Sequence, residues 1–222
     1  MIVEERLIYY LHSLEQENSK ILEGIEKEAL AARVPIIRKE MQSFLKVLLR
    51  ITKPECILEV GTAVGFSAIL MSEYVSKNTS ITTIENYEKR IQEARANFRR
   101  AGKDGQITLL EGDAMKVLPE LEGPYDFIFM DAAKGQYMAY FPEVLRLLGP
   151  GGVLLSDNVL QDGEIIQSRF AVERRDRTIH SRMREYLYTL KHHPDLETTV
   201  IPLGDGAALS VKISEMRKNT GE

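Results

Sequence analysis

The stretch that decides the fold is Cys56-Ile57-Leu58-Glu59-Val60-Gly61-Thr62-Ala63-Val64-Gly65-Phe66-Ser67. A short apolar run ends in an acid, a turn that contains Gly61 and Gly65 follows, and residues 67–74 then have a helical pattern. This order predicts a buried strand that leads into a helix through a tight loop. Glycines let the backbone turn sharply and let a ligand approach closely. The helix N-terminus behind the loop offers free N–H groups.

The glycine spacing does not match two common nucleotide-binding loops. Gly61 and Gly65 lack the middle glycine of the dinucleotide fingerprint, and no Gly-Lys-Ser/Thr follows as a Walker loop requires. The pattern Glu-Val-Gly-Thr-x-x-Gly-x-Ser resembles motif I of the class I S-adenosylmethionine-dependent methyltransferases, in their O-methyltransferase form. For this stretch alone, an ordinary strand-turn-helix corner with glycines kept for packing is the alternative.

Composition indicates one globular domain. The chain has 222 residues, 44% hydrophobic and 28% charged, which suits a sizeable core rather than disorder. We expect a single domain over 1–222, with a helical cover at 1–52 and a Rossmann-like core at 53–214. The net charge of −4 predicts no global attraction to nucleic acid. The single cysteine, Cys56, is expected in the core.

The sequence shows no apolar signal region and no run near the ~18 apolar residues of a membrane span. We therefore expect a cytoplasmic, soluble protein that does not contact membranes.

Apolar periodicity predicts two helices within residues 2–32 and a third over 39–50. From residue 57 onward, expected strands alternate with expected helices. The strands are 57–60, 80–84, 107–110, 127–130 and 153–156, and the helices are 67–74, 88–99, 114–121, 138–147 and 180–192. This alternation predicts a mostly parallel sheet with helices on both faces.

The last two expected strands, 198–202 and 207–213, are joined by Leu203-Gly204-Asp205-Gly206. So short a link cannot make a parallel crossover, so an antiparallel hairpin is predicted. The expected fold class is α/β: a Rossmann-like class I methyltransferase sheet with an antiparallel C-terminal hairpin and extra N-terminal helices. Those helices coat the core, cover the ligand site or pair with a second subunit, which makes a homodimer our expectation.

Acidic residues follow several of the predicted strands, where ligands bind in such sheets. Glu85 lies 24 residues after Gly61, a spacing that suits a carboxylate on a ribose diol. Asp113 follows the next strand, and a helix N-cap before Ala114 is its alternative role. Asp131 ends the strand 127–130, and Asp157 and Asn158 end the strand 153–156. Such oxygen donors, without His or Cys, favour Mg²⁺ over zinc.

Asp131-x-x-Lys134 and Asp157-Asn158-Val159 resemble the signature of the metal-dependent catechol and caffeoyl-CoA type O-methyltransferases. The likeness runs from about Pro35 to the C-terminus. It implies that the metal ligands are Asp131, Asp157 and Asn158, and that Lys134 and Asp131 are catalytic. It also implies that S-adenosyl-L-methionine is surrounded by Met41, Glu59, Gly61, Ser67, Glu85, Asp113, Ala114 and Asp131.

This chemistry is physically consistent. A methyl group leaves a cationic sulfonium by in-line displacement, so the acceptor must be an oxyanion at close range. A metal that chelates two vicinal oxygens lowers the acceptor's pKa and fixes its angle. Lys134 takes the proton if it is neutral or stabilises the oxyanion if it is charged. A solvated lysine with no role is the alternative.

Residues 169–191 carry seven Lys and Arg against three Asp and Glu, a local charge of +4. The segment follows the predicted metal-binding strand, so it is expected to overhang the mouth of the site. Guanidinium groups bind phosphate and stack on bases, and we expect Arg174, Arg175 and Arg177 to contact RNA. Arg–Glu pairs on a solvated helix face are the alternative.

This segment, together with Val34-Pro35-Ile36-Ile37, resembles the bacterial tRNA 5-hydroxyuridine methyltransferases. The resemblance implies methylation of 5-hydroxyuridine to 5-methoxyuridine at an anticodon wobble position, with the tRNA anticodon loop as partner. Gln161-Asp162-Gly163 departs from the plant-type pattern, where a Trp is usual. Two alternatives remain: a small-molecule O-methyltransferase for catechol-like or acyl-CoA phenolic substrates, and a non-catalytic RNA- or cofactor-binding module.

Overall fold

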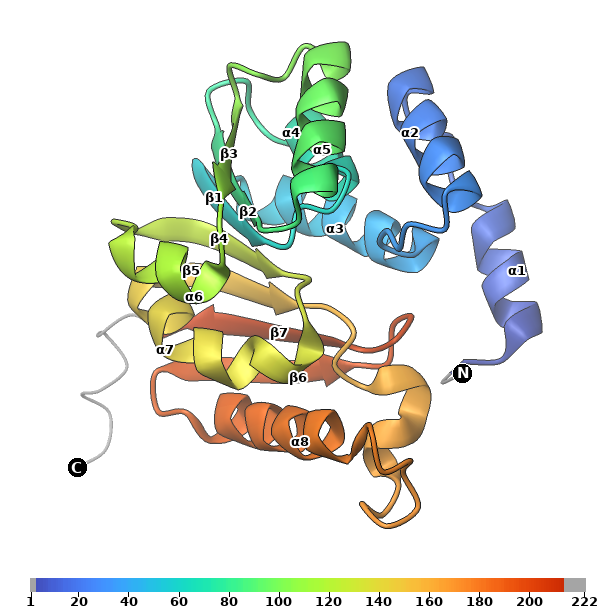
Figure 1. Ribbon diagram of the computed structural model, residues 1–222, viewed down its shortest axis with the longest axis vertical. Coiled ribbons are helices and arrows are strands. Elements are labelled where there is room, and N and C mark those ends of the chain that lie inside the picture. Colours follow the sequence, from blue (N-terminus) through green and yellow to red (C-terminus); the bar gives the residue numbers. More distant parts are fainter. Residues whose placement is uncertain (1–2, 214–222) are drawn as a thin grey trace.

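A computed structural model describes residues 3–213 and contains one seven-stranded sheet in the order β3-β2-β1-β4-β5-β7-β6 (Figure 1). All neighbouring pairs among the first five strands, β1 to β5, are parallel, and β7 runs antiparallel to both β5 and β6. The predicted α/β fold with a C-terminal antiparallel hairpin is therefore confirmed. The strands are β1 (Cys56–Val60), β2 (Ser80–Glu85), β3 (Ile107–Glu111), β4 (Tyr125–Met130), β5 (Leu148–Ser156), β6 (Leu196–Ile201) and β7 (Ala207–Lys212).

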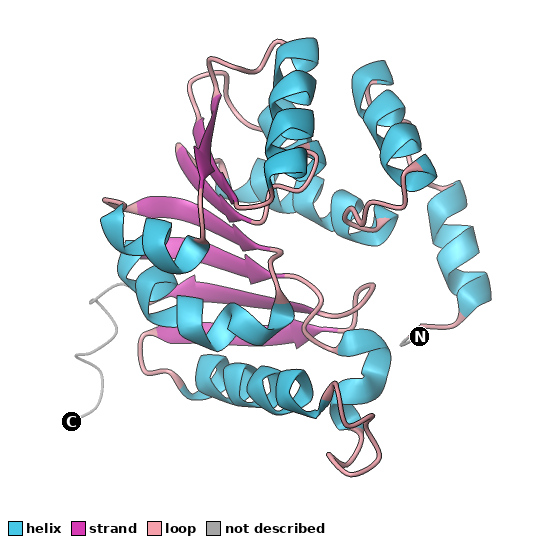
Figure 2. Cartoon of the chain, in the orientation of Figure 1, coloured by secondary structure: helices cyan, strands magenta, loops and turns pink. Residues whose placement is uncertain are grey.

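Helices cover both faces of the sheet (Figure 2). One apolar core joins the sheet to α2 (Lys20–Ala31), α3 (Lys39–Thr52), α4 (Phe66–Tyr74) and α5 (Glu88–Ala101). A second core joins the other face to α6 (Ala114–Val117), α7 (Tyr137–Leu147) and α8 (Arg177–His192).

The N-terminal helices α2 and α3 complete the burial of α4. Residues 66–72 of α4 are all buried, so this helix has no polar face to turn toward water. A helix that is buried on every side needs a further layer outside it, and Leu22, Ile25 and Leu45 of α2 and α3 belong to the same core. Coating the core is thus the observed role of these two helices.

The first helix, α1 (Glu5–Ser13), differs from its neighbours because it buries no residue. Leu7, Tyr9, Tyr10, Leu11 and Leu14 are all exposed. Pairing with a second subunit stays a prediction. Among the helices of residues 3–213, none combines the length and apolar character needed to cross a bilayer.

Element boundaries differ most from the sequence prediction around the C-terminal half of the sheet. β5 begins at Leu148 instead of residue 153, and α8 begins at Arg177 instead of residue 180. The expected helix at 114–121 splits into α6 and the 3-10 turn η1 (Leu118–Glu120), and two further 3-10 segments, η2 (Lys134–Gln136) and η3 (Gln161–Ile166), follow β4 and β5. Pro119 in η1 and three residues of η3 with positive φ (Gln161, Asp162 and Gly163) explain why apolar periodicity did not predict η1 and η3.

The antiparallel strand β7 brings the hairpin turn 203–206 to the ligand-binding edge. Ser156 at the end of β5 pairs with Ala208 near the start of β7. The Val159 and Leu160 amides donate to the Gly206 and Asp205 carbonyls at 2.9 and 2.8 Å. This turn therefore lies beside the residues that follow β5.

The β1–α4 loop depends on Gly61, which has a φ of +105°. A Cβ built there would lie 2.1 Å from the Asp131 carbonyl oxygen, so the loop packs directly on the backbone that follows β4. Gly102 also has a positive φ, +64°, but a Cβ there would meet nothing within 4 Å.

We expect Gly61→Ala to lower the free energy of unfolding by roughly 3 kcal/mol or more, because strain and a backbone clash add. Gly102→Ala is the matched control and carries only the left-handed strain of about 1 kcal/mol. Chemical denaturation measures both. Equal losses for the two variants would contradict the close packing of Gly61 on Asp131.

Candidate active site

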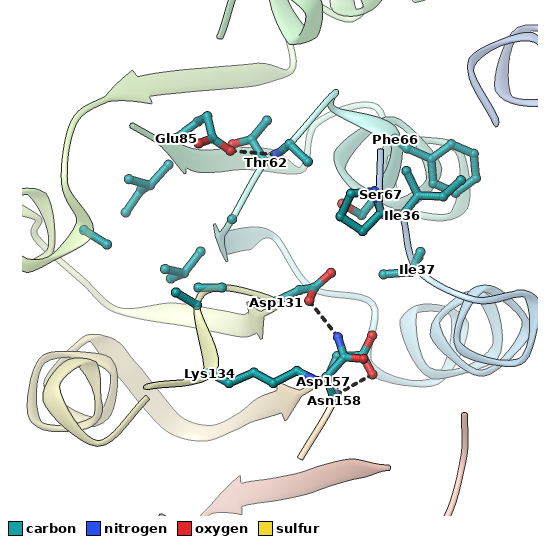
Figure 3. A pocket seen from close by; sticks show the side chains of 18 of the residues that line it. Ile36, Ile37, Thr62, Phe66, Ser67, Glu85, Asp131, Lys134, Asp157 and Asn158 are labelled. Atoms are coloured by element: carbon teal, nitrogen blue, oxygen red, sulfur yellow. Dashed lines mark hydrogen bonds between the residues drawn. The ribbon is translucent and has the colours of Figure 1, made fainter. Parts of the chain in front are cut away.

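A cavity of about 590 Å³ opens at the carboxyl ends of β1, β2, β4 and β5 (Figure 3). Its centre is a cluster of three polar side chains that follow two neighbouring strands. Asp131 follows β4, and Asp157 and Asn158 follow β5. The Asn158 Nδ2 donates to Asp131 Oδ1 at 3.0 Å, and the Asn158 amide donates to Asp157 Oδ1 at 2.7 Å. The three predicted metal ligands are therefore in contact.

At the two carboxylates of this cluster, burial outweighs the nearby positive charge of Lys134. Asp157 is only 4% exposed. Burial raises the pKa of both Asp131 and Asp157, and the negative charge of Asp131 raises the pKa of Asp157 further. Within residues 3–213, neither carboxylate forms an ion pair with Lys, Arg or His. Buried charges without a partner are costly.

The donor set fits a hard divalent cation. Asn158 has a φ of +60°, a left-handed conformation that directs its carboxamide toward Asp131. The described chain contains no cluster of three or more His, Cys, Asp or Glu side chains placed for a metal. Here the third donor is instead an amide oxygen. Two carboxylates and one amide match the preference of Mg²⁺ for oxygen ligands, with positions left for water or substrate.

Glu85, at the end of β2, is held in a fixed orientation. Its Oε2 accepts from the Ala63 amide at 2.8 Å, and its Oε1 accepts from the Asn86 and Tyr87 amides, both at 3.0 Å. These bonds tie the β1–α4 loop to the start of α5. The carboxylate still lines the cavity and keeps lone pairs for a ligand hydroxyl.

A buried hydrogen-bond chain lies behind the β1–α4 loop. The Ser67 hydroxyl donates to Glu59 Oε1 and the Thr83 hydroxyl to Glu59 Oε2, each at 2.5 Å. Burial raises the pKa of Glu59 to about 7, although the two hydroxyl donors lower it. Glu59, which accepts both hydrogen bonds, is fully buried, whereas Ser67 lies in the cavity wall.

The rim of the cavity is closed by an arginine between two aspartates. Arg38 Nη2 lies 2.8 Å from Asp205 Oδ1 and 3.4 Å from Asp162 Oδ1. These residues come from the link before α3, the β6–β7 turn and η3. One guanidinium thus joins three segments that are far apart in the sequence, and Arg38 and Asp205 line the cavity.

Comparison with known proteins identifies the family. The family model for O-methyltransferases matches residues 12–213. The chain belongs to the O-methyltransferase family. A catechol O-methyltransferase of Mycobacterium tuberculosis is 32% identical over 174 residues, which are 77% of this chain and 76% of that protein. The branch is therefore the S-adenosylmethionine-dependent catechol and caffeoyl-CoA type.

Two further similarities agree with this assignment. A catechol O-methyltransferase of Niastella koreensis is 39% identical over 127 residues, 55% of this chain and 58% of that relative, so the match spans less than two thirds of the relative. A solved O-methyltransferase of Bacillus cereus in complex with SAH has a TM-score of 0.82 and 27% identity, covering 92% of this chain and 96% of that one.

Most of the residues predicted for the O-methyltransferase site line one cavity: Gly61, Ser67, Glu85, Ala114, Asp131, Lys134, Asp157 and Asn158. Three predicted cofactor residues do not line it. Met41 is a core residue on the inner face of α3, and Glu59 lies beneath Ser67. Asp113 accepts from the Met115 amide at 3.0 Å, which confirms its N-cap role for α6. A contact of these three with the cofactor stays a prediction.

Sequence reasoning missed Arg38, Asp205 and Tyr140, which also line the cavity of the O-methyltransferase. A signal for Asp205 was present, because a strand antiparallel to β5 must begin where β5 ends. Arg38 gave no signal, since a single charged residue before a helix is common. Arg174, Arg175 and Arg177 lie outside the cavity wall.

The buried Glu59 makes the stability of this O-methyltransferase depend on pH. The unfolded carboxyl ionises near its ordinary value of 4.5, but the folded one holds its proton up to about 7. The stabilisation is therefore complete below the unfolded pKa and is lost as pH rises through the folded pKa.

Glu59→Gln keeps a neutral side chain of the same shape, so the variant should lack this loss. We expect the free energy of unfolding of the unaltered protein, relative to the variant, to fall by roughly 2–3 kcal/mol between pH 5 and pH 8. Urea denaturation across this range measures it. A difference that does not change with pH would show that Glu59 is ionised throughout.

Proposed function

We propose that this O-methyltransferase transfers a methyl group from S-adenosylmethionine to the 5-hydroxyl of 5-hydroxyuridine in tRNA, with Mg²⁺ as the assisting ion. The product is 5-methoxyuridine at an anticodon wobble position. The carbon–sulfur bond breaks, the new oxygen–carbon bond forms, and the hydroxyl proton is lost. The main support for an RNA acceptor is a segment with solvent-exposed arginines that follows β5 and η3, after Asp157 and Asn158 in the sequence.

The donor cluster supports an acceptor with two neighbouring oxygens. 5-Hydroxyuridine has its 5-hydroxyl beside the C4 carbonyl, the same arrangement of oxygens as in a catechol. Asp131, Asp157 and Asn158 would hold Mg²⁺ there, and the bound ion supplies Lewis acidity that lowers the pKa of the hydroxyl. The family's catechol-type members are consistent with this chemistry.

The chain's own residues supply orientation and charge. Glu85 would accept from the ribose hydroxyls of the methyl donor, because three amides already fix its carboxylate. Lys134 lies in the cavity wall at the start of η2 and faces the donor cluster (Figure 3). Its Nζ would accept the hydroxyl proton or stabilise the oxyanion that forms.

Charge outside the cavity favours RNA over a small acceptor. Of the exposed arginines in 169–175, only Arg175 forms ion pairs, with Glu173 at 3.0 Å and Asp176 at 3.3 Å. Arg169 and Arg174 form none within the described chain. Uncompensated guanidinium groups bind phosphate. The chain also contains no Trp to stack on a phenylpropanoid ring.

A small-molecule acceptor is the second candidate function. Its support is that two of the relatives are catechol O-methyltransferases. Such an acceptor would use the same donor cluster and the same Lys134. A catechol would not need the exposed arginines, whereas the phosphates of an acyl-CoA substrate could bind them.

The test compares the two acceptors directly with radiolabelled S-adenosylmethionine. We expect kcat/KM for tRNA that carries 5-hydroxyuridine to exceed that for catechol, with 5-methoxyuridine seen by nucleoside mass spectrometry. For the tRNA, log(kcat/KM) should fall with log[salt] with a slope of about −0.7 for each single-strand phosphate contact.

Lys134→Ala serves as the matched variant, with turnover lowered by roughly 10²-fold or more and affinity for the methyl donor nearly unchanged. A higher kcat/KM for catechol, without salt dependence, would assign the enzyme to small molecules. Unchanged turnover in Lys134→Ala would remove that residue from the mechanism.

A further inference from the structure

The last residue of η3, Ile166, and a residue of the loop between η3 and α8, Phe170, are large apolar residues with side chains exposed to solvent. Ile166 and Phe170 are each 84% exposed, more than any other large hydrophobic residue in the described chain. Single exposed apolar residues are common on protein surfaces. Here, however, the two lie within five positions of each other, and Arg169 directly precedes the aromatic one.

Hydrogen bonds hold this segment in one shape. Arg177 donates from Nη2 to the Phe170 carbonyl at 3.2 Å and from Nε to the Val172 carbonyl at 3.1 Å. Arg184 donates to the Ile165 carbonyl at 3.0 Å. Ile165 and Val172 are both 6% exposed, so a buried anchor lies on each side of Phe170. The backbone of Phe170 is thus braced while its ring points outward.

This bracing changes the expected role of Arg177. Its guanidinium is half-buried and already serves two backbone carbonyls, so its first task is to shape the segment. A direct contact of Arg177 with RNA stays a prediction. Arg169 and Arg174, one and four positions from Phe170 in the sequence, form no ion pair within residues 3–213, whereas Arg175 pairs with both Glu173 and Asp176.

The braced segment lies beside the cavity without lining it. Figure 1 shows η3 and the loop that follows it on the side to which β4 and β5 point. Asp162 in η3 pairs with Arg38 of the cavity wall, and Arg182 of α8 donates to the Gly135 carbonyl, next to Lys134. Phe170 is not among the residues that line the cavity. A ligand that touches Phe170 must therefore extend beyond the reacting group.

We propose that Phe170 stacks on an unpaired base of the tRNA loop, next to the nucleotide that is methylated. Arg169 and Arg174 contact the flanking phosphates. An aromatic ring beside free guanidinium groups is the combination that binds single-stranded nucleic acid, because bases stack on the ring while the cations follow the backbone. This inference rests on the proposed tRNA substrate and adds a specificity-determining residue to it.

The experiment measures methylation of two acceptors, tRNA that carries 5-hydroxyuridine and the free nucleoside 5-hydroxyuridine. Phe170→Ala should raise KM for the tRNA roughly 5- to 100-fold, because one base–aromatic stack is lost. Its kcat/KM for the free nucleoside should stay within about twofold, since that acceptor ends inside the cavity. Phe170→Trp keeps an aromatic face and should retain the low KM for tRNA.

Ile166→Ala is the matched control, because Ile166 is equally exposed on the same segment but has no aromatic face. It should change KM for tRNA by about threefold or less. An equal loss in both alanine variants, or an unchanged KM in Phe170→Ala, would overturn the stacking role. A change of sedimentation coefficient in Phe170→Ala would instead assign the ring to an interface between copies, which also overturns it.

The tRNA substrate and the stacking role of Phe170 are tested by different results. If the unaltered protein does not methylate the tRNA, the proposed function is wrong. If it does and Phe170→Ala methylates the tRNA with the same KM, only the stacking role is wrong. Thermal unfolding of each variant checks that the fold is intact, as expected for an exposed side chain.

Discussion

The site depends on one electrostatic interaction, the repulsion between the buried carboxylates of Asp131 and Asp157, which follow β4 and β5. Neighbouring parallel strands bring these carboxylates together, and the Asn158 carboxamide joins them through a 3.0 Å hydrogen bond to Asp131. Burial disfavours both charges, so the cluster is poorly satisfied by the protein alone. A bound divalent ion would remove that cost and create a Lewis acid at the same point.

The rest of the fold supports this edge of the sheet. Residues 66–72 of α4 are buried and require the outer layer of α2 and α3, and the link into α3 supplies Arg38 to the cavity rim. The antiparallel β7 returns the chain so that Asp205 meets Arg38 at 2.8 Å. Helices that look like a simple cover thus contribute both core burial and a wall of the site.

Sequence patterns predicted the parts of the protein that follow from periodicity and strand ends. The strand order of an α/β sheet places Glu85, Asp131 and Asp157 at one edge, so their meeting in one cavity was predictable. Side chains whose position depends on tertiary contacts were not. The helical spacing of Met41 predicts only that its side chain faces inward. It does not distinguish a place in the cavity wall from a place in the core beneath that wall. Arg177 reads as a free cation in the sequence, but the structure directs it to two carbonyl oxygens.

The most direct test of this account is Mn²⁺ binding, used as a probe for the Mg²⁺ site and followed by electron paramagnetic resonance. Asp126 of β4 accepts from the Glu55 and Cys56 amides at the opposite end of the strand, so Asp126→Asn is the control. We expect one ion per chain, with affinity lowered at least ~10-fold in Asp157→Ala and unchanged in Asp126→Asn. Binding that is equally strong in Asp157→Ala, or absent from the unaltered protein, would contradict a metal centre built from Asp131, Asp157 and Asn158.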